Sequence, residues 1–499
     1  MAMPISHDIG HSAPAAVHHP DIDSDLDALG TLQKIATTDA GHPIHWHPLK
    51  KWLIALIYCL LQVFVTMGTT TYVSAEYLIT EGLAAPDTSP QLVALGQSIF
   101  IFGTAVGPVF LGPLSDIGGR KWVYVASILA YALLNFGTAL AVDLPMLIVF
   151  QFLCGAAGST ALSNVAGTIA DLFGDSAGAG QPMALFVSSA NIGASIGSPV
   201  GEVIAENLGL RWIFYINIII GGGFALMMCF VPETLPRVVI RNAALQGQVP
   251  APIVEEEEQK GSKRLDVLKQ MRFVLTMALR IMVTEPIVAF LGVFNGFAYG
   301  LLFLYLDGVF DVFVDANNLS PLGADLTYLN FVVGVSVMFC FVPVQTWLYR
   351  RDKERNGGVG RPEARFLTSL ACVWLFPVSL LWFGFTDYGN VSYWSPVVAG
   401  AVLGFCDPLL WLAMLNYIAD SYTNVAASAI AAFLIPSFLI AAALVHAGLA
   451  MFDNMTVEWA VALLGFISLG LVVLVHVLYF FGPWLRKQSK LATNRPVSP

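Results

Sequence analysis

Residues 458–483 read EWAVALLGFISLGLVVLVHVLYFFGP, an apolar run in which Glu458 is the only acidic residue, His476 the only histidine, and no Lys or Arg occurs. A bilayer hydrocarbon core ~30 Å thick is crossed by a helix of ~20 apolar residues, each adding about 1.5 Å. This run is therefore long enough to cross a membrane, and it predicts a transmembrane helix.

The whole chain repeats this character. Hydrophobic residues make up 57% of its 499 residues and charged residues 12%, with a mean hydropathy of +0.71. A soluble domain carries about 25% charged residues, so much of this surface must face something other than water. The sequence predicts an all-α integral membrane protein with twelve transmembrane helices, over 52–75, 91–113, 122–142, 145–166, 183–205, 213–231, 281–306, 325–349, 367–385, 394–418, 426–450 and 458–483.

One long polar segment, after the sixth run, divides the chain into two halves of six helices each. It contains the acidic run Glu255–Glu258, followed by several basic residues. Twelve spans in two halves favour a transporter with its site at the midplane between the halves. The predicted regions are a disordered tail over 1–50, a first half over 51–231, a central loop over 232–280, a second half over 281–483 and a C-terminal tail over 484–499.

The basic residues predict the orientation. With the N-terminus inside, 23 of the 24 lysines and arginines fall in inner segments, and the exception is Arg211. Cytoplasmic loops carry an excess of Lys and Arg, so both termini and the central loop are expected in the cytoplasm.

Several other classes of protein find no support. All six cysteines lie in apolar runs, which favours free buried thiols over disulfides. The first 50 residues hold seven of the nine histidines without regular ligand spacing, so we expect a solvated tail and no metal site. No phosphate-binding Gly-Lys loop or nucleophile arrangement is present, and the basic residues are dispersed. We therefore expect no enzyme activity, no cofactor and no nucleic-acid partner.

Between the second and third runs, residues 112–121 read GPLSDIGGRK. The segment resembles the G-x-x-x-D-x-x-G-R-K signature of the major facilitator superfamily, at the position where that family carries it. Its paired glycines allow a sharp turn, and Asp116 can cap a helix N-terminus and pair with Arg120 or Lys121. The resemblance implies a major facilitator fold whose gate includes Gly112, Asp116, Gly119, Arg120 and Lys121.

The fifth run is similar to the G-x-x-x-G-P-x-x-G-G element of the antiporter branch of that family. Ser198 replaces one Gly of the element and Glu202 replaces the last. Glycines four residues apart allow another helix to approach closely, and proline bends a helix. The resemblance assigns Gly197, Pro199 and Gly201 to gating, while ordinary helix packing is the alternative reading.

Shorter matches extend from residue 52 to residue 489 and resemble the fungal drug:proton antiporter group with twelve spans. They comprise Arg211–Asn217, Pro232–Pro236, Pro362–Arg365, Asn416–Tyr422 and Ala427–Ala431. The resemblance implies proton-driven export of drugs, polyamines, organic acids or secreted metabolites.

The chain departs from this group at three basic positions. Gln151 replaces the Arg of the R-F-L-x-G pattern, residues 178–182 lack the usual Arg-Gly pair, and Pro436 replaces another Arg. The usual route of proton coupling is therefore incomplete, and the sequence leaves the direction of transport and the coupling ion open.

Asp407 is the strongest candidate for a protonatable or substrate-binding carboxylate. It lies about 13 residues into the tenth run, roughly 20 Å from the outer face, beside the helix-breaking Pro408. Ionisable groups at such depth are costly and usually functional. A structural Asp, hydrogen-bonded within the bundle, is the alternative.

Other polar side chains lie near mid-depth by the same estimate. The resemblance implies that spans 1, 4, 7 and 10 line one cavity, so the predicted substrate-binding or coupling residues are Asp407, Gln62, Gln151, Asn295 and Trp411. Each amide has interhelical hydrogen bonding as its alternative role. Four further residues, nearer the ends of the spans, are expected to gate or cap: Glu202, His446, Asp171 and Glu285.

The first hypothesis is a secondary exporter of small amphipathic molecules that works by alternating access. Uptake or uniport of an organic acid or nutrient is a second, and a non-transporting membrane sensor is a third. The expected partners are a small-molecule substrate, the lipid bilayer and protons, with the protein a monomer. The resemblance places it in the plasma membrane, with the vacuolar membrane as the alternative.

Overall fold

The computed structural model describes residues 41–174, 180–245, 272, 276–309, 312–314, 317–386, 391–422, 426–489 and 491–492. Within these ranges the regular structure is helical, and eleven helices are long and apolar enough to cross a membrane. A shorter apolar stretch, Ser369–Gly384, lies where the ninth span is expected. The predicted all-α membrane fold is confirmed.

The spans of the first half are α2 (Pro48–Thr70), α4 (Pro90–Gly118), α5 (Arg120–Ala139), α6 with α7 (Leu144–Gly158 and Thr160–Phe173), α8 (Gly180–Leu208) and α9 (Leu210–Phe230). The spans of the second half are α13 (Pro286–Val309), α15 (Leu329–Arg355), α16 with α17 (Ser369–Cys372 and Leu375–Gly384), α18 (Trp394–Ser421), α19 (Ala426–Asn454) and α20 (Val457–Gln488). Short helices at the ends of the spans are η1 (Pro43–His45), η2 (Val73–Ala75), α3 (Glu76–Gly82), α10 (Pro236–Leu245), α14 (Pro321–Leu326) and η4 (Pro362–Phe366).

Local sequence explains where several helices begin. Asp143 accepts a hydrogen bond from the Met146 backbone N–H at 2.9 Å, and a proline occupies the first turn of α6. Ser320 caps α14 in the same way, again before a proline. A side-chain acceptor satisfies an N–H that has no partner inside the helix, and proline has no N–H to lose.

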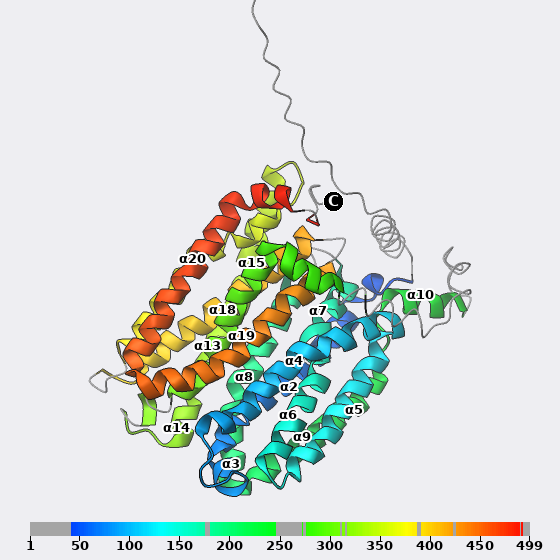
Figure 1. Ribbon diagram of the computed structural model, residues 1–499. Coiled ribbons are helices and arrows are strands. Elements are labelled where there is room, and N and C mark those ends of the chain that lie inside the picture. Colours follow the sequence, from blue (N-terminus) through cyan, green and yellow to red (C-terminus); the bar gives the residue numbers. More distant parts are fainter. Residues whose placement is uncertain are drawn as a thin grey trace, which may run out of the picture.

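The helices pack in the same pairs in both halves. In the first half α2 packs on α8, α4 on α6 and α5 on α9, and in the second half α13 packs on α19, α15 on α18 and α17 on α20. The two halves lie side by side, with the blue-to-green helices on the right of Figure 1 and the green-to-red helices on the left. They meet along two seams, where α4 packs on α19 and where α8 packs on α15.

The two ends of the bundle differ in charge. The basic end carries the Gly112–Lys121 segment, α10, η4 and the start of α2, and with them every described Lys and Arg except Arg211. The far end carries α3 and α14, at the lower side of Figure 1.

Some expected boundaries were wrong. The N-terminal tail was expected to run through residue 50, yet residues 41–50 form η1 and the start of α2, and His42 is buried. Ile44 lies against Gly174 at the end of α7, so packing holds this segment. The central loop contains α10, and α20 continues to Gln488 within the expected C-terminal tail. Residues 1–40, 246–271 and 493–499 lie outside the described residues.

The glycines of the fifth span bring α8 against α2. A Cβ added to Gly197 would lie 1.9 Å from the Thr70 hydroxyl, and one added to Gly193 would lie 2.4 Å from the Val63 carbonyl oxygen. Only glycine fits at this separation. This contact lies within one half, as the helix-packing reading expected, and Pro199 is accommodated inside an unbroken helix.

Candidate functional site

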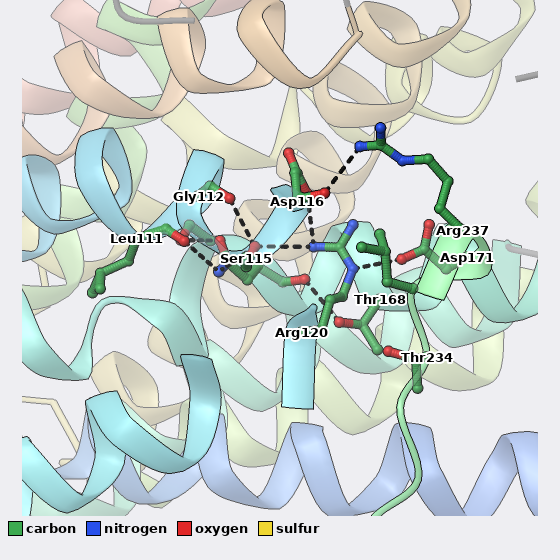
Figure 2. Close-up of polar contacts among 12 residues, drawn as sticks. Leu111, Gly112, Ser115, Asp116, Arg120, Thr168, Asp171, Thr234 and Arg237 are labelled. Atoms are coloured by element: carbon green, nitrogen blue, oxygen red, sulfur yellow. Dashed lines mark hydrogen bonds and ion pairs between the residues drawn. The ribbon is translucent and has the colours of Figure 1, made fainter. Parts of the chain in front are cut away.

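The buried centre of the basic end is the Arg120 guanidinium. Its Nε donates to Asp171 Oδ2 at 2.5 Å, and its Nη1 lies 3.3 Å from Asp116 Oδ1. Figure 2 shows Arg120 between these two carboxylates, with Arg237 of α10 donating to the Asp116 backbone oxygen at 3.0 Å. The expected pairing of Asp116 with Arg120 is present, and Asp171 joins α7 to the same cation.

Glu233 caps the third span, a role that the sequence suggested for Asp116. Its carboxylate accepts from the backbone N–H groups of Arg120 and Lys121 at 2.9 and 3.2 Å. It also accepts from its neighbours Thr234 and Leu235 at the start of α10, at 2.9 Å each. One carboxylate therefore ties the turn of the signature to α10, because a negative charge at a helix N-terminus is favourable.

The second half has a matching arrangement. Arg365, before the ninth span, donates from Nε to Asp420 Oδ2 at the end of the tenth span, at 2.8 Å. Its guanidinium also lies 4.0 Å from the ring centre of Tyr349. Although burial disfavours its charged form, the Asp420 carboxylate raises the pKa of Arg365 above its usual value. Each half thus holds one buried Arg–Asp pair at the basic end.

A cavity lies between the halves at the basic end of the first seam, and a much smaller one lies beside the second seam. On the first seam, a cavity of about 140 Å³ extends from Asp116 and Arg120 along α4 and α19 to Phe438. On the second seam, a cavity of about 20 Å³ lies among α8, α15 and α18, next to Gln345 and Arg365.

Hydrogen bonds join the halves at the far end of both seams. On the first seam, His446 Nε2 of α19 lies 2.7 Å from the Ser98 hydroxyl of α4, and His446 Nδ1 lies 3.0 Å from Gln91 Oε1. On the second seam, the Ser198 hydroxyl of α8 donates to Asp325 Oδ1 of α14 at 3.0 Å. The halves are therefore hydrogen-bonded to each other at the far end, and a cavity lies between them at the basic end of the first seam.

Three of the buried polar atoms that lack a hydrogen-bond partner among the described residues belong to predicted site residues. They are Asp407 Oδ2 and Trp411 Nε1 of α18 and Gln62 Nε2 of α2. Their residues are at most 5% exposed. A buried polar atom without a partner costs free energy, so these atoms mark where a bound molecule or a proton would supply the missing interaction.

Aromatic rings from both halves surround Trp411. Its ring centre lies 6.0 Å from that of Phe186 on α8 and 5.8 Å from that of Tyr299 on α13. Tyr299 lies 6.0 Å from Phe438, which also lines the cavity of about 140 Å³ on the first seam. These spacings are typical of aromatic pairs. Phe186, Tyr299, Trp411 and Phe438 thus form an aromatic cluster, and one member, Phe438, lines the cavity that extends from the signature.

The structure brings most of the predicted site residues toward this cluster. Gln62 Oε1 accepts from Ser189, one helical turn from Phe186, at 2.6 Å. Asn295 donates to Ser437 on α19 at 3.2 Å, which is the interhelical role considered for it. Gln151 is buried on α6, and no described hydrogen bond or ring contact joins it to the cluster.

Helix α18 does not break beside Asp407. It continues through Pro408 from Trp394 to Ser421. Because Pro408 has no N–H, the carbonyl one turn earlier, at Gly404, loses its usual donor. A break in the helix was expected to expose several backbone groups, but only the Gly404 carbonyl loses its hydrogen-bond donor.

Sequence reasoning missed the aromatic members of the site. Tyr299 follows Asn295 by four residues and therefore shares its helix face, so this spacing was a usable signal. Phe186 and Phe438 had no such signal, because Phe is common in every span and only the assembled seams select these two. Glu233 was quoted as part of a family match, but no role was assigned to it.

Comparisons with known proteins agree with this architecture. Residues 58–443 match the family description "Major Facilitator Superfamily". The chain is 48% identical over 474 residues to an uncharacterized transporter of Schizosaccharomyces pombe, covering 94% of this chain and 86% of that protein. It is 41% identical over 464 residues to a vitamin B6 transporter of the same yeast, covering 92% and 86%.

More distant matches extend the comparison. A multidrug transporter of Candida glabrata is 30% identical over 462 residues, covering 91% of this chain and 78% of that protein. The solved structure of a proton:xylose symporter matches with a TM-score of 0.59 at 13% identity, covering 87% of this chain and 96% of that one. The similarity to the symporter structure supports the fold alone.

Proposed function

The chain belongs to the major facilitator superfamily and is a membrane transporter, and on that premise we propose that it carries a small aromatic molecule with polar substituents. The proposed site is the aromatic cluster with Asp407, and transport proceeds by rocking of the two halves about it. The proposed substrate is amphipathic, as the sequence suggested, and the proposal restricts the substrate class to compounds with a planar ring.

The proposal rests on one observation: buried polar atoms without hydrogen-bond partners lie close to aromatic side chains. Asp407 and Trp411 lie four residues apart and therefore share one face of α18, and each has a buried polar atom without a partner. Tyr299 and Phe186, from different halves of the protein, offer ring surfaces next to Trp411. A planar substrate with a hydrogen-bond donor and an acceptor would satisfy these polar atoms while stacking on the rings.

The relatives support the same class of substrate. Vitamin B6 compounds are substituted pyridines, small planar rings with hydroxyl groups, and the relative named for that vitamin shares 41% of its aligned residues with this chain. We take a compound of this size and chemistry as the first substrate to test.

We further propose that protons drive transport through Asp407. The usual basic positions are occupied by Gln151 and Pro436, so Asp407 is the buried carboxylate left to exchange a proton near the site. A buried carboxylate is stabilised either by a proton or by a donor from the substrate. Alternation between these two partners would link the movement of the proton to that of the substrate.

Transport by the purified chain in liposomes tests the proposal. Labelled pyridoxine is offered with and without a pH gradient, and Asp407→Asn is compared with Asp453→Asn, a control on an exposed residue of α19. We expect the gradient to drive accumulation in wild type and control, and Asp407→Asn to abolish it at equal protein incorporation. Normal gradient-driven transport by Asp407→Asn would overturn the role of the carboxylate.

Export of larger amphipathic compounds is the second candidate. The 30% identity to a multidrug transporter and the cavity along α4 and α19 favour it. Drug accumulation in cells with and without the gene separates the two, since an exporter of drugs lowers the cell content whereas a pyridoxine carrier leaves it unchanged.

We also propose that the basic end faces the cytoplasm and that the protein acts as a monomer in the plasma membrane. The charge difference between the two ends supports this orientation. Protease sensitivity of a tag at either terminus, in sealed and in permeabilised cells, tests the orientation, and imaging tests the location.

A further inference from the structure

A groove on the outer surface of the first half lies apart from the transport site. It runs between the start of α2 and the end of α9 at the basic end, with a volume of about 380 Å³. Its walls are apolar, formed by Leu49, Leu53, Ile54, Ile57, Met227, Phe230, Val231 and Pro232.

The walls of this groove face outward. Leu53 is 52% exposed and Phe230 is 81% exposed, whereas Ile54 is buried and forms the floor. Both helices cross the membrane, so this exposed apolar surface lies against acyl chains. The groove is an indentation along a membrane-facing surface, open toward the basic end.

Two nitrogen-bearing side chains, those of His47 and Lys50, line the end of the groove nearest the basic end, which we call its mouth. The Lys50 ammonium lies 3.6 Å from the ring centre of Trp46, and Lys50 also lines the groove. His47 Nδ1 accepts the Leu49 backbone N–H at 3.3 Å. With Nδ1 accepting this hydrogen bond, Nε2 is the ring nitrogen that can donate to a ligand.

No described carboxylate neutralises this mouth. Glu233 follows Pro232 directly, but its carboxylate is occupied by backbone N–H groups at the starts of α5 and α10. The mouth therefore combines the Lys50 cation, the His47 imidazole and the positive N-terminal end of α2.

We propose that this groove binds an anionic glycerophospholipid. One acyl chain lies along Leu53, Ile57 and Phe230, and the phosphate contacts Lys50 and His47. The arrangement of the groove matches that of a phospholipid. Its apolar part runs along the membrane-spanning helices, and its positively charged end lies at the level of the lipid headgroups. If the basic end faces the cytoplasm, the negatively charged leaflet lies on the same side.

Native mass spectrometry of the full chain in detergent tests the proposal. Phosphatidylglycerol and phosphatidylcholine with identical acyl chains are titrated onto the protein. We expect preferential retention of phosphatidylglycerol, and a loss of about fivefold or more in its affinity when Lys50→Gln and His47→Gln are combined. The matched control is Arg351→Gln, which removes a cation 5.2 Å from a Trp ring at the same end but outside the groove.

A second variant tests the acyl-chain part of the site. Leu53→Trp fills the groove at an exposed position, where the larger side chain displaces lipid and no core residue, and we expect it to weaken both lipids. Unchanged phosphatidylglycerol affinity in both groove variants would overturn the proposal. It would also fail if Arg351→Gln caused an equal loss, or if glycerol 3-phosphate bound as tightly as the whole lipid. Transport of the proposed substrate is measured separately, because lipid binding does not depend on Asp407.

Discussion

The imidazole of His446 and the hydroxyl of Ser98 lie 2.7 Å apart, although the two residues belong to different halves of the protein. The other ring nitrogen of His446 meets Gln91 of the same partner helix at 3.0 Å. One side chain thus makes two polar contacts across the far end of the first seam, in addition to the Ser198–Asp325 bond on the second.

Removal of these contacts is expected to loosen the far end. In His446→Leu we expect faster hydrogen exchange in the first turns of α4, where Gln91 and Ser98 lie. The control His476→Leu removes an imidazole that bonds within its own helix, 2.8 Å from the Val472 oxygen. Equal exchange in wild type and His446→Leu would show that these bonds do not hold the far end closed.

The indole N–H of Trp411 is expected to contribute to substrate affinity. Trp411→Phe keeps a ring and removes the unpartnered donor, so we expect KM to rise about fivefold, corresponding to about 1 kcal/mol for one hydrogen bond. Trp374→Phe, at a ring that is 52% exposed, serves as control. An unchanged KM in flux measurements would exclude the N–H from recognition.

The buried pair of Arg120 and Asp171 is expected to stabilise the folded protein. Arg120→Gln leaves the Asp171 carboxylate without its cation, and breaking a buried pair in this way costs about 3–5 kcal/mol. We expect a lower unfolding temperature in detergent, and a similar fall for Arg365→Gln, which orphans Asp420. Arg211→Gln, at an exposed far-end residue, should match wild type, and an equal fall there would contradict the prediction.

The turn at Gly119 is expected to reject any side chain. Its φ of 96° and ψ of 146° are unfavourable for other residues, and an added Cβ would lie 2.6 Å from Glu233 Oε2. Gly119→Ala should therefore cost about 1–3 kcal/mol and displace the carboxylate that caps α5. Gly118→Ala meets nothing within 4 Å, so it should have little effect on unfolding temperature or transport; equal losses in the two variants would contradict this account.

The fold was predictable because span length, charge and loop position follow from the bilayer. A run such as 458–483 has few stable alternatives to a transmembrane helix, and the basic residues mark one end independently of packing. The signature likewise identified Asp116 and Arg120 as neighbours, because the sharp turn at Gly118 and Gly119 brings the end of one span next to the start of the next.

The site was only partly predictable. Asp407 and Trp411 were found because charge and indole are rare at mid-depth, whereas Phe186 resembles every other membrane Phe until two helices distant in sequence meet. The capping role of Glu233 also depends on a contact across more than a hundred residues, which no local pattern contains.

The contacts at the far end also affect the relative populations of two conformations of the transporter, one closed at the far end and one open there. Three hydrogen-bonded pairs, at about 1 kcal/mol net each, would favour the far-closed arrangement by about 3 kcal/mol. That bias leaves roughly one molecule in a hundred in the opposite arrangement at rest. Reversing such a ratio completely requires a ligand that prefers the rarer arrangement by about 5.5 kcal/mol. Only the difference in substrate affinity between the two arrangements counts toward this amount, however tightly the substrate binds, and the proton exchange proposed at Asp407 would contribute the remainder.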